Sequence, residues 1–233
     1  MKLYKLTKRN TTRYGMRWGA GVTNTVAPRT DLVAHLPQLC TSDVIHAYVH
    51  PLQALRNRGQ HGYSGNVQFW EAEGEPVAWD GTKVGVKALT TIKPLPIYYK
   101  GWTDGLQRVA NSLATLLPLL EQPLGHPRTG SKPIKDIKAA VAKFLADPRV
   151  LRYEERFPLM ARAYRIKDSD TRALAQKIVE AMSWGSTPSG KPLEIQQAFE
   201  QAWPYIQPML EAARQEALAK RREKDRARRA AQQ

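Results

Sequence analysis

The spacing of apolar residues changes near residue 102, and this change constrains the fold more than any other feature of the chain. Before it, apolar and polar residues alternate in short runs such as MKLYKLT, VIHAY, VQFWEAE and KVGVKALTTI. A period of two places alternate side chains on opposite faces of a β-strand. After it, apolar residues recur every three or four positions, which predicts amphipathic helices. We therefore expect an α+β protein, with a mostly antiparallel β domain over residues 1–102 and helices beyond.

Turn-forming residues divide the β domain into an expected four to six short strands. The run RNTTRYGMRWGAGVTNTV has three interleaved glycines and predicts a hairpin or an irregular strand pair. Pro51 follows VIHAY and suits the first turn of a short helix. Asp80-Gly81 predicts a tight turn between the last two strands, and the glycine-rich stretch 59–66 predicts a mobile loop.

Capping residues and prolines outline the helices of the second half. We expect a helical region over 103–210, with a Pro- and Gly-rich linker at 121–133, and a basic helix or arm over 211–233. The predicted helices begin at Thr103 or Asp104, at Pro133, at Ser169 or Asp170 and at Pro192, and Pro204 is expected to interrupt the last of them.

The net charge of +15 is concentrated at the two ends of the chain. Residues 1–30 carry +7 and residues 211–233 carry +4, whereas residues 31–102 are neutral and residues 103–210 carry +4. Basic groups gain affinity for phosphates by releasing condensed counterions, so this distribution predicts that the termini contact a polyanion. The alternative is that the positive charge only keeps the protein soluble.

Basic and aromatic side chains near both ends are the candidate contacts with nucleic acid. Trp18 lies beside arginines, and a single strand is bound by stacking combined with phosphate neutralisation. The alternative is that Trp18 fills the core. The C-terminal run has no apolar stripe, so it is either a solvated, fraying helix or an arm that becomes ordered on phosphates. The predicted contacts are Arg9, Arg13, Arg17, Trp18, Arg56, Arg58, Lys220, Arg221, Arg222, Lys224, Arg226, Arg228 and Arg229.

The Cys and His residues do not form a metal-binding pattern. Cys40 is the only cysteine of the chain, which favours a small buried side chain over a reactive thiol and fits a reducing compartment. His46 and His50 are four positions apart, but a strand would separate them by about 13 Å. We predict no metal site and no resident cofactor.

Glutamates and histidines supply the only candidate catalytic cluster. Glu71 and Glu73 share one face of a predicted strand, and His46 or His61 would approach them if the strands pair. Such a cluster can transfer protons or orient a ribose. Alternating glutamates are also typical of a strand face in solvent, and no phosphate-binding glycine loop is present. We therefore expect a protein that is not an enzyme.

An ordered set of short motifs over residues 2–96 resembles an uncharacterised family of small phage and prophage proteins. The motifs are YKLT (4–7), Trp18-Gly19 with Val22-Thr23, Leu39-Cys40, IHAY (45–48) with Pro51-Leu52, WEAEGE (70–75), Asp80-Gly81 with KVG (83–85), and LTTI (89–92) with PLP (94–96). The chain departs from that pattern in SDV before IHAY and in an Arg- and Gly-rich insert after Pro51. The resemblance implies a phage-type accessory protein in the cytoplasm of a host cell.

A cytoplasmic location and the absence of a membrane partner are expected on composition as well. No apolar run approaches the roughly 20 residues that cross a bilayer. The N-terminus also lacks the apolar segment of a signal peptide.

More remotely, a Tyr-bearing first strand, a His-bearing second and a Glu-bearing later strand look like the strand order of ADP-ribosyltransferase-like folds. That resemblance implies a site for nicotinamide adenine dinucleotide (NAD) lined by His46, Tyr48 and Glu71 or Glu73. The function expected first is nevertheless nucleic-acid binding, to DNA or RNA with low sequence specificity, by a non-enzymatic accessory protein. Binding and inhibition of a host complex that contains nucleic acid is the second, and the NAD-dependent transferase is the third.

Overall fold

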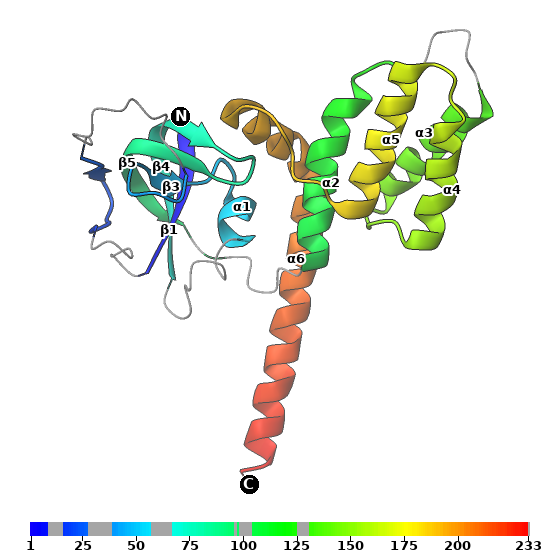
Figure 1. The fold of residues 1–233 in the computed structure, drawn as a ribbon. Coiled ribbons are helices and arrows are strands. Elements are labelled where there is room, and N and C mark those ends of the chain that lie inside the picture. The colour runs from blue at the N-terminus through cyan, green and yellow to red at the C-terminus, as the bar shows by residue number, and fades with distance from the viewer. Residues whose placement is uncertain are drawn as a thin grey trace. The chain divides into compact units, whose positions relative to one another are not determined.

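The chain forms two compact units in a computed structural model that describes residues 1–8, 16–27, 39–56, 67–95, 97, 104–124 and 131–232 (Figure 1). The first unit contains Met1–Tyr98 and Ser189–Gln196, and the second contains Tyr99–Pro188 and Gln197–Gln233. The predicted boundary at residue 102 lies outside the described residues. So do residues 125–130 of the predicted linker, the glycine-rich loop, and the candidate residues Arg9, Arg13, Arg58 and His61.

In its described residues the first unit contains five antiparallel strands and one short helix, and with the helices of the second unit they confirm the predicted α+β class. Four strands follow the order β1-β4-β5-β2, and β3 pairs with β5. The elements are β1 (Lys2–Lys8), β2 (Val22–Thr25), β3 (Ile45–Ala47), α1 (Pro51–Arg56), β4 (Val67–Trp79) and β5 (Val84–Leu95).

The sheet curls back on itself, because the chain after β3 returns to β1. Tyr4 and Tyr48 exchange two backbone hydrogen bonds, with N···O distances of 2.8 and 2.9 Å. Leu6, Tyr48 and Phe69 are buried together beside this bridge, and the Tyr4 ring stacks on Phe69 with 5.9 Å between ring centroids. Tyr48 and Phe69 therefore contribute aromatic rings to the core of this unit.

Strand β4 continues six residues beyond Glu73, where the predicted alternation ends, and it does so through a glycine and a proline. The pairing with β5 shifts register between Gly74 and Pro76 and again between Pro76 and Ala78. Proline is tolerated in a sheet at such irregularities, because it need not donate to the ladder there. Gly74 is required by space, since a Cβ at this position would lie 2.8 Å from the Ala88 carbonyl oxygen.

Five helices build the second unit, four of which correspond to predicted helices. They are α2 (Asp104–Leu120), α3 (Lys132–Ala146), α4 (Tyr153–Tyr164), α5 (Ser169–Trp184) and α6 (Pro192–Ala230), whose first turn belongs to the first unit. Helix α2 packs on α5, and α4 packs on both α3 and α5. Helix α4 falls in a stretch for which the apolar spacing predicts no element.

The predicted interruption at Pro204 is wrong, because α6 runs from Pro192 to Ala230 as a single helix. Pro204 and Pro208 both lie inside it and both are exposed. Each proline removes one backbone hydrogen bond, but the carbonyl that is left over on an exposed face can bind water. The segment 211–233 therefore begins as the direct continuation of a packed helix.

The N-cap of α5 is Asp168 and not the predicted Ser169 or Asp170. The Asp168 carboxylate accepts a hydrogen bond of 2.7 Å from the Thr171 backbone N–H. At the other end Gly185 closes the helix in the left-handed conformation, with φ of 62°.

Replacing this cap tests the assignment. Asp168→Ala is expected to lower the free energy of unfolding by about 1 kcal/mol, because one helix N–H loses its acceptor. Ser169→Ala, one position later, is the matched control and should change it by much less. Urea unfolding followed by helical circular dichroism measures both, and equal effects of the two variants would contradict the assignment.

Candidate functional site

The last turns of α6 present a dense group of basic side chains to solvent. Every residue from 218 to 230 is exposed, and Leu210 is the last buried residue of the helix. We call residues 218–230 the basic tail (the red end of the ribbon in Figure 1). It contains the seven predicted contacts Lys220, Arg221, Arg222, Lys224, Arg226, Arg228 and Arg229.

Helical spacing sorts six of these seven side chains into two rows. Lys220, Lys224 and Arg228 follow one another at intervals of four, so they lie along one side of the helix. Arg222 and Arg226 form a second row with the same interval, which Arg229 extends. Two acidic residues, Glu223 and Asp225, lie within the tail. Each row is suited to following a chain of phosphates.

The first lysine of the tail is held by an acidic partner. Lys220 Nζ lies 2.5 Å from a carboxylate oxygen of Glu216 one turn earlier. The hydrogen bond with Glu216 raises the pKa of Lys220 and lowers that of Glu216. Both side chains are exposed, so the pair contributes little to stability.

Two of the predicted N-terminal contacts, Arg17 and Trp18, lie in the described part of the chain. Arg17 is exposed, and its backbone carbonyl accepts a hydrogen bond of 2.8 Å from Asn24. Trp18, in contrast, is 2% exposed, so its predicted role as a stacking surface is wrong and the core alternative holds. Arg56 is the last residue of α1.

Trp18 adjoins a buried lysine, Lys5, which shares one face of β1 with the buried Leu3. Lys5 Nζ lies 5.4 Å from the centroid of the Trp18 ring and donates a hydrogen bond of 2.6 Å to the His46 carbonyl. Burial lowers the pKa of Lys5 to about 8. The next strand supplies Trp70 opposite Lys5, and its indole N–H donates to Thr7 at 3.0 Å. This cation belongs to the interior and not to the surface that meets solvent.

The four catalytic candidates have separate environments. Tyr48 is buried in the core cluster. Glu71 lies between two lysines, with its Oε2 3.2 Å from Lys2 Nζ and 3.7 Å from Lys93 Nζ. Glu73 is exposed at the next outward position of β4. His46 Nε2 accepts a hydrogen bond of 2.8 Å from the Cys40 backbone N–H.

Strand register shows how far apart these groups lie. His46 is opposite Gly85 of β5, whereas Glu73 is opposite Thr90, five positions further along the same strand. Five residues of strand correspond to roughly 16 Å. The structure therefore separates His46 from Glu73, whereas Tyr48 and Glu71 both neighbour Tyr4.

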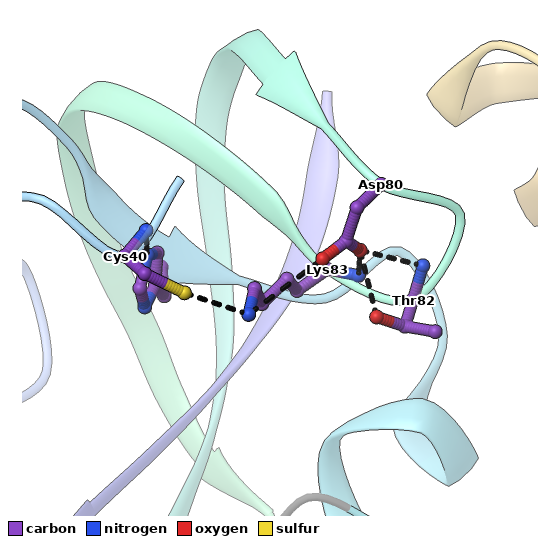
Figure 2. A network of polar contacts seen from close by, with 5 residues as sticks. Cys40, Asp80, Thr82 and Lys83 are labelled. Carbon is purple, nitrogen blue, oxygen red and sulfur yellow. Dashed lines mark hydrogen bonds and ion pairs between the residues drawn. The ribbon is translucent and has the colours of Figure 1, made fainter. Parts of the chain in front are cut away.

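A second polar network surrounds Cys40, which is exposed and not buried as predicted (Figure 2). Lys83 Nζ lies 3.0 Å from the Cys40 sulfur and 3.6 Å from an Asp80 carboxylate oxygen. The other Asp80 oxygen accepts hydrogen bonds from the Thr82 hydroxyl and from the backbone N–H groups of Thr82 and Lys83, at 2.7 to 2.9 Å. The predicted Asp80-Gly81 turn is thus tied to the loop that carries the thiol.

Through these contacts Lys83 links the Asp80-Gly81 turn to the turn that contains Cys40. Partial burial opposes the charged form of Lys83, but the hydrogen bond with Cys40 and the charge of Asp80 outweigh it and raise its pKa. Cys40 itself has φ of 67°, a conformation that L-residues seldom adopt, and His46 holds its N–H. Spacing along the chain gave no sign of this network, because Cys40 and Lys83 are 43 positions apart.

Comparisons with known proteins leave the family open. No family model, no curated protein and no solved structure matches the chain. The resemblance to phage proteins and that to ADP-ribosyltransferase-like folds therefore stay predictions. Among the described residues, no helix combines the length and the apolar composition needed to cross a bilayer. Within the same residues, no three His, Cys, Asp or Glu side chains gather in a way that could hold a metal ion.

Proposed function

We propose that this protein binds nucleic acid mainly through phosphate contacts from the basic tail, with Arg17 as a contact from the N-terminal part. The observation that carries the proposal is a helix that continues for 13 residues, 218–230, in which every side chain is exposed and seven are basic. A cationic helix that projects no apolar side chain into a core is suited to neutralising phosphates.

The charge pattern of the tail favours a ligand over simple solvation. Like charges four residues apart repel each other and weaken a helix. The tail contains three such pairs, Lys220 with Lys224, Lys224 with Arg228, and Arg222 with Arg226. A polyanion relieves this repulsion, whereas a tail selected only for solubility would gain more from added acidic residues. We propose that this binding has low sequence specificity. Experiment is needed to choose between DNA and RNA.

Salt dependence tests the proposal directly. Replacing Arg221, Lys224 and Arg228 with Gln removes three charges and keeps good helix formers. The affinity for a fluorescent oligonucleotide should fall at least tenfold. The slope of log affinity against log salt should become shallower by about 0.7 to 0.9 per phosphate contact removed.

A matched control distinguishes the effect of the tail from the effect of net charge. Lys135, Lys138 and Lys143 are exposed lysines of α3, and changing all three to Gln removes the same charge from a packed helix. Deletion of residues 218–233 should reduce the slope further than either triple variant. An unchanged slope after that deletion would refute the role of the tail. Nuclease-resistant capture of one host protein would instead favour inhibition of a host complex.

The transferase alternative is not proposed further, since no geometry of the described residues favours it. Strand register separates His46 from Glu73, and Tyr48 is part of the core.

A further inference from the structure

We propose that the outward side of α4, together with Trp184, is a stacking surface for the bases of single-stranded nucleic acid. This inference rests on the proposed nucleic-acid binding and adds to it a second surface and a preference for single strands. The surface consists of Tyr153, Phe157, Tyr164 and Trp184, which we call the aromatic face.

The exposure of these side chains is the first observation. Tyr153, Phe157, Tyr164 and Trp184 are 70, 62, 66 and 61% exposed, more than any other large hydrophobic side chain of the described residues. A monomeric soluble protein rarely leaves a contiguous group of this kind uncovered unless it binds something. The core of the same unit is closed without them, because α4 buries Leu159 and Ala163 on its other side.

The arrangement of the rings is the second observation. Tyr153, Phe157 and Tyr164 are four and seven positions apart and so share one side of α4, over about 16 Å of helix. The rings of Tyr153 and Phe157 are stacked, with centroids 6.1 Å apart and an angle of 28° between their planes. These are flat surfaces of the kind on which successive bases stack.

Trp184 joins this surface from the end of α5. Helices α4 and α5 pack together, and the Leu151 N–H just before α4 donates a hydrogen bond of 2.9 Å to the Met182 carbonyl. This contact places the end of α5 beside the start of α4. The Arg156 guanidinium then lies over the Trp184 ring, 4.2 Å from its centroid. A cation held on a ring face in this way adds to base stacking in single-strand binding.

The charge around the aromatic face is positive. Glu155 is neutralised by Arg149 at 2.8 Å, and Arg162 by Asp136 at 3.3 Å. The remaining charged residues of the segment 149–167 are four basic ones, Arg152, Arg156, Arg165 and Lys167, against the single acid Glu154. Arg156 Nε is buried and has no hydrogen-bond partner among the described residues.

Aromatic residues and arginine also occur at protein interfaces, but two features favour a nucleic acid here. The face has no exposed Leu, Ile or Val, the side chains with which a helical partner would interlock. The basic residues around it also have the same sign as the net charge of +15, and positive charge favours an anionic partner.

Substitution of Phe157 tests this surface with fluorescence anisotropy on single-stranded oligothymidine and on a duplex of equal length. Phe157→Leu keeps an apolar side chain but removes the ring, and it should weaken single-strand binding about five- to tenfold. Phe157→Tyr should bind like the parent protein. The slope of affinity against salt should not change, because no phosphate contact is lost. Trp79→Ala, at an exposed tryptophan of β4, is the control for losing a surface ring.

The outcomes separate the two proposals. Loss of single-strand affinity in Phe157→Leu, with duplex binding retained, supports the stacking surface. If the tail variants change the salt slope while Phe157→Leu and Tyr153→Ala leave both affinities unchanged, the stacking surface is refuted and the proposed function survives. In that case the aromatic face serves a protein partner. If neither oligonucleotide binds the parent protein, the proposed function is refuted with it. Circular dichroism of each variant confirms that the helices are intact.

Discussion

At pH 4 the first unit is expected to be about 3 kcal/mol less stable against unfolding than at pH 7 because of His50 alone. His50 is 6% exposed, and burial lowers its pKa from 6.5 to about 3. Between these two values the unfolded chain binds a proton that the folded chain does not. Acid therefore favours unfolding, and the stability present above pH 6.5 is lost as the pH falls toward 3.

The position of His50 provides a variant that removes the titration and keeps the structure. His50 is the N-cap of α1, since its Nδ1 accepts a hydrogen bond of 3.3 Å from the Leu52 N–H. Its carbonyl accepts from Gln53 and Ala54. Asn is among the best N-cap residues and offers an acceptor in a similar place. His50→Asn should therefore flatten the stability curve between pH 4 and pH 7 by about 3 kcal/mol. Urea unfolding at a series of pH values measures it, and parallel curves for the two proteins would contradict the assignment.

On the alkaline side, raising the pH from 7 to 10 is expected to stabilise the same unit by about 2.5 kcal/mol through Lys5. The pKa of Lys5 is about 8 in the folded protein against 10.5 in the unfolded chain, because burial disfavours the ammonium. The unfolded chain holds the proton over this range and the folded chain releases it. Burial of the Lys5 ammonium therefore destabilises the folded unit fully below pH 8, and this effect is absent above pH 10.5.

Lys5→Met isolates this contribution. Methionine has a similar length and no charge, so the stability of the parent protein should rise by about 2.5 kcal/mol relative to that of the variant as the pH rises from 7 to 10. The lost hydrogen bond to the His46 carbonyl affects the variant equally at every pH and does not change the slope. Lys2→Met is the control, because Lys2 is exposed and its pKa is raised. Burial lowers the pKa of Lys2, but the hydrogen bond and the charge of Glu71 outweigh this effect. A parent curve with the same slope as that of Lys5→Met would rule out the buried cation.

The strands and most helices were predictable because each is specified by a local pattern. Alternation located β1, β3 and β5, and capping residues located α2, α3 and α5 to within a few positions. Helix α4 was not predictable in this way. Its large aromatic residues face solvent and its buried side chains are Leu159 and Ala163, so the usual relation between apolar spacing and the core is inverted.

The candidate site likewise has one part that a local pattern predicts and another that depends on tertiary contacts. The basic tail was predictable because seven basic residues in ten consecutive positions, 220–229, need no tertiary contact to be recognised. The aromatic face was not, since Trp184 reaches α4 only through the packing of α4 on α5. The separation of His46 from Glu73 was also hidden, because strand pairing and register depend on the whole sheet.

By itself, then, the sequence determined the α+β division, the ends of most elements and the charge of the two termini, all of which are properties of short stretches of chain. The tertiary structure decided which side chains are in solvent. It buried Trp18 and Lys5, exposed Cys40, and turned the rings of α4 outward. The physical reason is that periodicity defines the two faces of a strand or helix, whereas burial depends on which neighbour each face meets.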